Sequence, residues 1–251
     1  MRRPYLMGNW KMNQLKEDID AFFNSMPKTL DWNKIKCALA PQAIHIDYLQ
    51  NKCKESEIEV GSQNCAAFED GAYTGELSVN ALKQAGVDFS LIGHSERRTL
   101  FNESDELLNQ KFELCMKHNH KVVFCVGETL QDRESNKTHE VLERQLREGL
   151  KGLKQDHIPY LVVAYEPVWA IGTGLTAKPE QANDAHQFIR SFLSEHFQID
   201  SQKVWILYGG SVKPANIEEL LAKEDIDGAL IGGASLKGES YFEMVEKAIS
   251  I

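Results

Sequence analysis

The sequence predicts an α/β fold in which short strands alternate with helices along the whole chain. Three observations favour it. Apolar, β-branched runs recur eight times, helical patterns fill the gaps between them, and no linker, charge block or low-complexity tract interrupts the order. Several runs, such as Val122–Val126, are almost continuously apolar, which is typical of parallel strands buried on both faces. We therefore expect one domain over residues 1–251.

The expected strands, in chain order, are Tyr5–Trp10, Lys36–Ala40, Ile58–Gln63, Phe89–Gly93, Lys121–Gly127, Tyr160–Tyr165, Val204–Tyr208 and Gly228–Gly232. Apolar residues at helical spacing predict helices over Leu15–Phe23 and Glu106–His118. A proline is tolerated in the first turn of a helix, where its missing N–H costs nothing. Pro179 and Pro214 therefore predict two further helix starts.

This pattern is compatible with two architectures. Eight strand–helix pairs in 251 residues match the size of a (β/α)8 barrel. A doubly wound open sheet also alternates strands and helices, so alternation alone does not separate the two. In both architectures ligands bind beyond the carboxyl ends of the strands. The polar residues that follow each run are therefore the candidate site residues.

Composition and charge exclude several classes of protein. The chain is 42% hydrophobic and 26% charged, and no apolar run approaches the roughly 20 residues of a membrane span. Met1–Pro4 leads into a short apolar stretch that does not predict a signal peptide. The net charge of −9 argues against general nucleic-acid binding, although local donors can still bind an anionic substrate. Five cysteines without metal-ligand spacing predict reduced thiols and a cytoplasmic location.

Polar side chains follow three of the expected strands. Asn9 and Lys11 come after the first, His94 and Glu96 after the fourth, and Glu166 after the sixth. A carboxylate, an imidazole and a cation are groups that acid–base catalysis uses. Each alone has a simpler interpretation, such as a solvated loop lysine or a carboxylate that caps a turn. Their joint placement at one rim favours a functional site.

Glycine pairs follow the last two strands. Gly209-Gly210 precedes Ser211, and Gly232-Gly233 ends the eighth run. A glycine pair often only permits a turn, but it also lets backbone N–H groups approach a phosphate closely. A following helix start adds a favourable dipole. The segment 172–174 lacks the third glycine of a dinucleotide fingerprint, so a phosphate site is the better prediction.

Five segments together resemble the triosephosphate isomerase family, in the order in which that family has them: Gly8–Asn13, Gly93–Arg98, Ala164–Gly174, Tyr208–Val212 and Gly228–Leu236. The resemblance covers roughly residues 5–248. It implies a single-domain (β/α)8 TIM barrel. It also implies the glycolytic and gluconeogenic interconversion of dihydroxyacetone phosphate and D-glyceraldehyde 3-phosphate through an enediolate, with no cofactor and no metal.

The resemblance implies a role for each catalytic candidate. Glu166 matches the base that moves a proton between adjacent carbons, and His94 matches the electrophile that polarises the carbonyl. Lys11 matches the cation near the phosphate and the developing oxyanion, and Asn9 a polar substrate contact. Glu96 matches a supporting carboxylate. Losing one prearranged donor to an enediolate costs about 3–4 kcal/mol in the barrier, so this set should matter for rate.

Further residues are implied around the catalytic set. Main-chain N–H groups that bind phosphate are expected at Gly172, Ser211, Gly232 and Gly233. A mobile lid that excludes water is expected over Pro167, Val168, Trp169, Ala170, Ile171, Gly172, Thr173 and Gly174. The apolar pair that covers the base is expected at Ile171 and Leu230.

The segment Gln63–Glu76 resembles the family's long dimer loop, which enters a neighbouring subunit. Thr74 matches the residue that makes this contact, and Tyr73 stands where phenylalanine is commoner. A long loop in a compact domain is usually functional, which agrees with this assignment. The resemblance therefore implies a homodimer, with a triose phosphate as the small-molecule partner.

Two classes of rival function remain for the residues alone, and the first is another phosphate-binding barrel enzyme, either an epimerase or an aldolase. A metal-dependent sugar-phosphate epimerase would need several His and Asp ligands at strand ends, where only His94 of the eight histidines qualifies. A Schiff-base aldolase would need a lysine within a central strand, whereas Lys11 follows its strand. The other rival is a barrel that binds without catalysis. Turnover by the purified protein separates that class from an enzyme.

Overall fold

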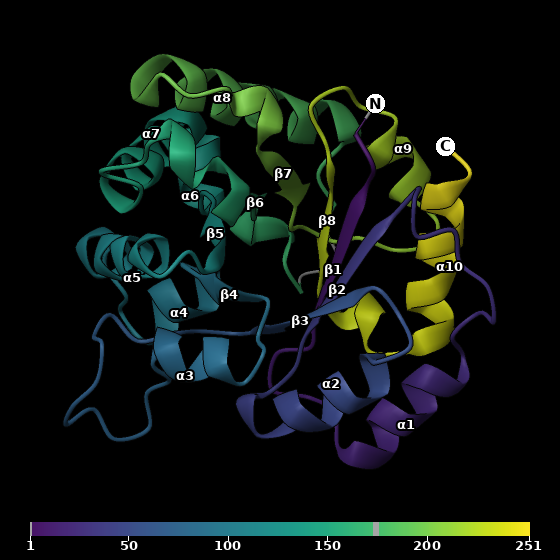
Figure 1. Cartoon of the computed structure of the whole chain (residues 1–251). Helices are drawn as coiled ribbons and strands as arrows, with labels where there is room; N and C mark the ends of the chain where they lie inside the picture. The colour runs from purple at the N-terminus through teal and green to yellow at the C-terminus, as the bar shows by residue number, and fades with distance from the viewer. Residues whose placement is uncertain (1, 173–175) are drawn as a thin grey trace.

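Eight parallel strands close into a barrel, and helices surround it (Figure 1). The structure is a computed structural model that describes residues 2–172 and 176–251. The strands run as β1 Tyr5–Asn9, β2 Lys36–Ala40, β3 Ile58–Ser62, β4 Phe89–Ile92, β5 Lys121–Val126, β6 Leu161–Tyr165, β7 Trp205–Tyr208 and β8 Gly228–Ile231. Neighbours in sequence are neighbours in the barrel, and β8 pairs with β1.

The helices lie on the outside of the barrel in Figure 1. The α-helices are α1 Lys16–Asn24, α2 Ile46–Cys53, α3 Val79–Gln84, α4 Ser95–Leu100, α5 Asp105–Lys117, α6 Leu130–Glu134, α7 Thr138–Gly149, α8 Pro179–Phe197, α9 Ile217–Leu221 and α10 Gly238–Ile249. Short 3₁₀ turns are η1 Ala43–His45, η2 Gln155–Tyr160, η3 Val168–Ala170, η4 Ser201–Lys203 and η5 Gly233–Ser235. No helix among these described residues is long and apolar enough to cross a membrane.

The pairing of β8 with β1 confirms the barrel over the open sheet. In that pair Tyr5 lies opposite Gly228 and Gly8 opposite Ile231. All eight expected strands are present, and their ends agree with the prediction to within one residue. Helix α8 begins at Pro179, as predicted.

The predicted helix start at Pro214 was wrong. Helix α9 begins at Ile217, and Pro214 lies in the turn before it. The cause is the side chain of Asn216, which accepts from the main-chain N–H of Lys213 and donates to the carbonyl of Ser211. Such side-chain bonds to the backbone favour a turn over a helix.

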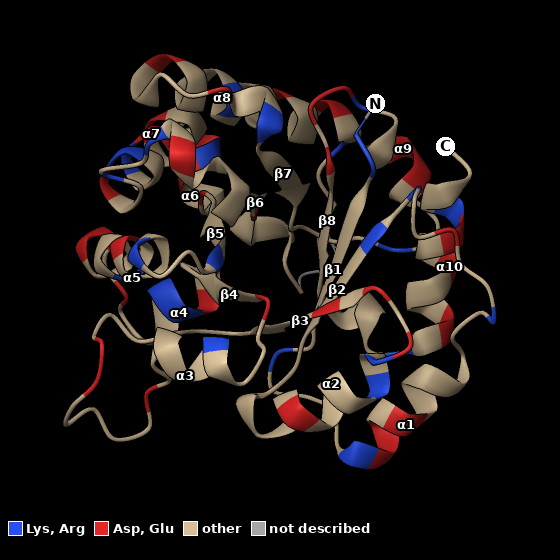
Figure 2. Cartoon of the chain, viewed as in Figure 1, with Lys and Arg blue, Asp and Glu red and all other residues tan. Residues whose placement is uncertain are grey.

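The strands alternate between two cores. Tyr5 and Met7 point into the barrel and pack there with Phe89, whereas Leu6 packs outward with the helices. Charged residues are few on the strands and frequent on the helices and loops, as Figure 2 shows. This alternation leaves the carboxyl ends of the strands, where each chain enters a loop, as the place for polar chemistry.

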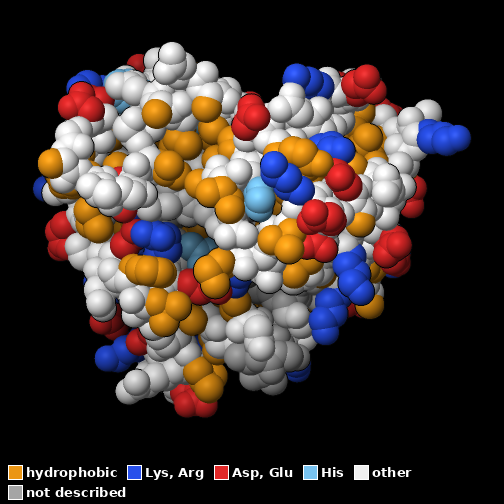
Figure 3. All heavy atoms as spheres, turned by 90° about the horizontal axis from the view of Figure 1, so that it is seen from below, with side chains coloured by type: hydrophobic (Ala, Val, Ile, Leu, Met, Phe, Trp, Pro, Cys, Tyr) orange, Lys and Arg blue, Asp and Glu red, His pale blue; other side chains and the backbone are white. Residues whose placement is uncertain are grey.

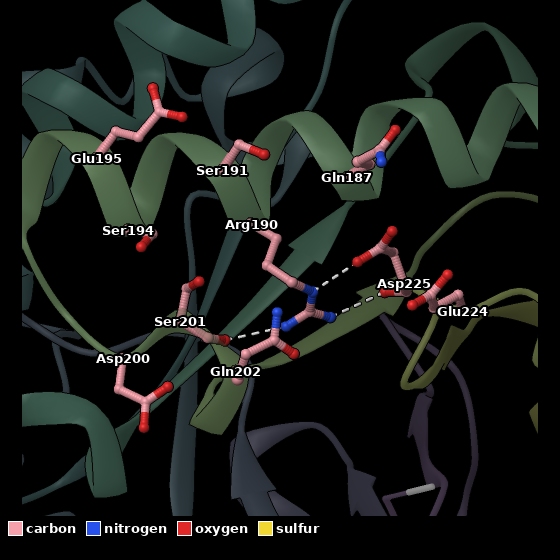
Figure 4. Close-up of a pocket in the computed structure, with 10 residues that line it drawn as sticks. All are labelled: Gln187, Arg190, Ser191, Ser194, Glu195, Asp200, Ser201, Gln202, Glu224 and Asp225. Carbon is pink, nitrogen blue, oxygen red and sulfur yellow. Dashed lines mark hydrogen bonds and ion pairs between the residues drawn. The ribbon is translucent and has the colours of Figure 1, made fainter.

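At the opposite end of the barrel, Arg190 joins α8 to the segments that lead into β7 and β8. Its guanidinium, almost fully buried, donates to Asp225 and Asp227 at 2.8 Å each and to the carbonyl of Ser201 at 3.0 Å. Figure 4 shows it pointing from α8 towards Asp225 and Ser201 beside a polar hollow of about 400 Å³. Burial raises the pKa of Asp227 even beside this arginine. The cluster is therefore a structural clamp.

Arg190→Ala should lower the free energy of unfolding by about 3–5 kcal/mol, because it leaves the carboxylate of Asp225 without its cation and removes one of the two arginines that pair with Asp227. The control is Arg147→Ala, which removes an exposed pair with Glu143 and should cost less than about 0.5 kcal/mol. Urea unfolding of both variants measures the difference. Equal losses would contradict the assignment of Arg190 as a clamp.

Candidate active site

A cavity of about 390 Å³ lies beyond the carboxyl ends of the strands; we call it the rim cavity. Figure 3 looks onto this end of the molecule. Most of the predicted site residues line the rim cavity together: Asn9, Lys11, His94, Glu166, Ala170, Ile171, Gly172, Ser211, Leu230, Gly232 and Gly233. They come from the ends of β1, β4, β6, β7 and β8, which the closed barrel brings to one rim.

Glu166 follows β6 directly and is 2% exposed. Its own main-chain N–H donates to the carbonyl of Val126 at 2.7 Å, which continues the pairing of β6 with β5. One carboxylate oxygen accepts from the main-chain N–H of Ser95 at 2.9 Å. The other lies 3.1 Å from Nε2 of His94. A buried carboxylate is thus held between a backbone donor and an imidazole.

His94 caps the amino end of α4. Its Nδ1 accepts from the main-chain N–H of Glu96 at 3.2 Å. A ring nitrogen that accepts a hydrogen bond carries no proton, so this bond assigns the neutral tautomer with its proton on Nε2. That Nε2–H is the group that faces Glu166. The helix start after His94 therefore also sets which nitrogen of the ring can donate into the rim cavity.

Hydrogen bonds of its main chain hold Lys11 in place. Its backbone lies in the left-handed region, with φ of 50°. Its N–H donates to Oδ1 of Asn9 at 3.0 Å, and its carbonyl accepts from the side chain of Gln63 at 2.8 Å. Its Nζ is 2.6 Å from a carboxylate oxygen of Glu96. Glu96 does not line the rim cavity itself and acts on it through Lys11 and His94.

One side of the rim cavity is made mainly of backbone from the last two loops. Gly232 and Gly233 follow β8, and Gly233 opens the turn η5, while Ser211 follows β7. Exposed N–H groups beside glycines suit an anion such as a phosphate. Two lining residues with polar side chains, Lys213 and Asn13, were not among the site residues predicted from the sequence. Lys213 follows Ser211 by two residues, so its place after a strand was the signal that could have found it.

The lid prediction covers residues 167–174, of which Thr173 and Gly174 lie outside the described residues. The described part begins with Pro167 and the turn η3, which contains Val168, Trp169 and Ala170.

Glu128, which follows β5 and is fully buried, anchors this turn. One of its carboxylate oxygens accepts from the indole N–H of Trp169 at 2.8 Å, from Tyr165 at 3.1 Å and from Arg133 at 3.2 Å. Its main-chain carbonyl accepts from Val168 at 3.1 Å. Burial raises the pKa of the Tyr165 hydroxyl well above its usual range, which keeps this donor protonated. The sequence reasoning did not find Glu128, because no motif marks it.

Thr74 lies away from the rim cavity, on the exposed loop between β3 and α3. Phe68 and Tyr73 of the same loop stack with their ring centroids 4.0 Å apart, and both are partly exposed. In residues 2–172 and 176–251, no cluster of three or more His, Cys, Asp or Glu side chains could hold a metal ion.

Comparison with known proteins agrees with this geometry. The family model described as triosephosphate isomerase matches residues 4–248, almost the whole chain. The chain belongs to the triosephosphate isomerase family. A curated relative from Finegoldia magna, named triosephosphate isomerase, is 47% identical over 249 residues, which is 98% of each chain. The residues that match the family model thus include all the strands and loops that line the rim cavity.

Two glycines of this site differ in the space around them. A Cβ added to Gly209 would lie 2.8 Å from Cγ of Glu166 and 3.1 Å from the carbonyl of Tyr165, whereas one added to Gly233 would meet no atom within 4 Å. Gly209→Ala should therefore cost about 1–3 kcal/mol in the free energy of unfolding through overpacking. Gly233→Ala should stay within about 0.5 kcal/mol of the wild type. Chemical denaturation measures both, and similar values would contradict the close packing of Glu166.

Proposed function

We propose that the chain acts as a triosephosphate isomerase, which interconverts dihydroxyacetone phosphate and D-glyceraldehyde 3-phosphate, with the residues of the rim cavity as its catalytic site. Family membership supports the reaction. One observation supports the location of the site best. The buried carboxylate of Glu166 lies 3.1 Å from the Nε2–H of His94, in a cavity whose lining residues include glycines suited to binding a phosphate.

In this mechanism Glu166 removes the proton from the carbon next to the carbonyl. The electron pair of that C–H bond forms the C=C bond of the enediolate, and the former carbonyl oxygen takes the negative charge. The Nε2–H of His94 and the ammonium of Lys11 stabilise that charge. The hydroxyl on the first carbon then gives its proton to the former carbonyl oxygen. The proton on Glu166 returns to the adjacent carbon, the C=C electron pair forms that new C–H bond, and the first carbon becomes the carbonyl carbon of the product. A neutral imidazole suits this role better than an imidazolium would, because its proton affinity is closer to that of the enediolate.

Glu166 does not start in its working position. Its Oε2 is bonded to the N–H of Ser95, so the carboxylate has to turn away from Ser95 to reach a substrate carbon. We assign Ile171 and Leu230 to the apolar cover of that position, since both line the rim cavity and Leu230 is 3% exposed. We assign residues 167–174 to a lid, whose closing excludes water from the rim cavity.

We assign the main-chain N–H groups of Gly172, Ser211, Gly232 and Gly233 to the phosphate, because all four residues line the rim cavity. We add Lys213 to this set, because a second cation beside Lys11 favours a doubly charged group. Asn9 is a polar substrate contact and also positions the main chain of Lys11.

We further propose that two copies of the chain form a homodimer through the loop 63–76 and exposed apolar residues at the same end of the barrel. Met12, Ile44 and Phe101, which follow β1, β2 and β4 in the chain, are each more than 60% exposed, and exposed apolar side chains that gather at one end of a molecule are typical of an interaction site. Figure 3 shows hydrophobic side chains at several places on this end of the molecule. Thr74, at the exposed end of the loop, is the residue that we assign to the partner's site.

We place the protein in the cytoplasm. All five of its cysteines are free and buried, as expected for a protein kept in a reducing compartment.

The purified wild type should isomerise D-glyceraldehyde 3-phosphate without added metal or nucleotide. Glu166→Ala should lower kcat by about 1000-fold or more, because the base is lost. Glu166→Asp withdraws the carboxylate by one methylene and should lower kcat by about 100-fold with little change in phosphate affinity. A coupled assay measures all three, with the exposed Glu143→Ala as a control that keeps wild-type activity. A folded but inactive wild type would instead favour a barrel that only binds.

The dimer proposal is tested by Thr74→Arg, which places a bulky charge at the exposed end of the loop. Sedimentation equilibrium should show a dimer for the wild type and a shift towards monomer for the variant, with a parallel loss of activity. The control is Lys151→Ala, which changes an exposed residue in the loop after α7, distant in sequence from Thr74. A monomeric and fully active wild type would contradict the proposal.

A further inference from the structure

Two buried cysteines lie side by side where the loop after β3 begins. The sulfur atoms of Cys65 and Cys115 are 3.6 Å apart and share a hydrogen bond. Neither residue is exposed to solvent. Cys65 comes three residues after the end of β3, and Cys115 lies on α5. Fifty residues of chain separate them in sequence, so this contact is made by the fold.

The shared hydrogen bond makes the two thiols unequal. It lowers the pKa of Cys65 and raises the pKa of Cys115. The ammonium of Lys111, one helical turn before Cys115 on α5, also favours the thiolate of Cys65. Elsewhere burial has the opposite effect, since it raises the pKa of Cys37 and of Cys53 to about 12. Cys65 is thus the better nucleophile, with a second sulfur already in contact.

We propose that Cys65 and Cys115 form a reversible dithiol–disulfide pair that responds to hydrogen peroxide. The Cys65 sulfur attacks one oxygen of the peroxide and breaks the O–O bond; with the transfer of one proton this gives a sulfenic acid and one water. The Cys115 sulfur then attacks the sulfenic sulfur and expels its hydroxyl, which leaves with the Cys115 proton as a second water. Two thiols are oxidised by two electrons and one peroxide is reduced.

The two cysteines lie between two other contacts that join α5 to the loop after β3. On one side, Nζ of Lys111 lies 2.7 Å from the side-chain oxygen of Asn64. On the other, His118 lies 2.7 Å from Glu69. The two ends of the loop are joined by a hydrogen bond from the N–H of Ala66 to the carbonyl of Leu77 at 2.8 Å. A covalent bond between the two cysteines would hold the start of the loop on α5 against thermal opening.

This inference does not depend on the catalytic assignments, because neither cysteine lines the rim cavity. It concerns the segment that carries the proposed dimer loop. Oxidation should therefore change stability before it changes the chemistry of the site.

The test exposes the fully reduced native protein to hydrogen peroxide, quenches it, and counts thiols after denaturation. The count should fall from five to three and return to five with dithiothreitol. Trypsin cleaves after lysine and should release residues 55–83 and 112–117 as one joined peptide under non-reducing conditions. The melting temperature of the oxidised wild type should rise, because the unfolded chain is now cross-linked.

Matched variants complete the experiment. Cys115→Ala should lose at most the one thiol of Cys65, as a sulfenic acid without a disulfide, and should give no joined peptide and no rise in melting temperature; Cys115→Ser serves where the alanine variant is poorly folded. Cys53→Ala, which removes an unpaired buried thiol, should still lose two of its four. Five thiols remaining in the wild type, at a dose that oxidises free glutathione, would overturn the proposal. So would oxidation of Cys65 beyond the sulfenic acid without a bond to Cys115.

Discussion

The pairing of β8 with β1 is the constraint on which the rest of this structure depends. The two strands meet so closely that a Cβ at Gly228 would lie 2.0 Å from the carbonyl oxygen of Tyr5. Because all strands are parallel, closing the barrel turns eight separate carboxyl ends into one continuous rim. Residues as distant in sequence as Asn9 and Gly233 then line the same cavity. An open sheet would leave these first and last strands at opposite edges.

At that rim the proposed catalytic groups are positioned largely by the backbone. The N–H of Ser95 holds Glu166, the N–H of Glu96 holds the ring of His94, and the side chain of Asn9 holds the backbone of Lys11. Backbone donors are fixed by the strands and helices that contain them, so they need little reorganisation as charge develops. The flexible ionic contact of Lys11 with Glu96 is the exception, since it is partly exposed.

Much of this arrangement could be predicted from the sequence, for identifiable reasons. Buried parallel strands have a strong apolar signature, so their limits were predicted to within one residue. Site residues that directly follow a strand, such as Glu166 and His94, were predicted by position. Residues that act through tertiary contacts left no local signal. Glu128 became visible only when the fold brought Trp169, Tyr165 and Arg133 onto it. Likewise, the start of α9 depends on side-chain bonds of one asparagine rather than on Pro214.

The Cys65–Cys115 pair shows the same limit, since spacing along the chain gave no reason to join two of five cysteines. Such contacts come from how α5 packs beside the loop that follows β3. The fold therefore supplies two kinds of information. The order of strand ends, which a sequence contains, places the reacting groups. The packing of helices against loops, which a sequence contains only indirectly, decides how firmly those groups and loops are held.

The central claim is that the Glu166 carboxylate carries the proton between the two carbons of the substrate. The most direct measurement is the exchange of carbon-bound hydrogen of dihydroxyacetone phosphate with solvent deuterium, followed by proton NMR. The wild type should introduce deuterium at the carbon next to the carbonyl, and Glu166→Gln, which keeps the shape but not the base, should abolish this exchange. Exchange by Glu166→Gln at the wild-type rate would contradict the account, because another group would then be the base.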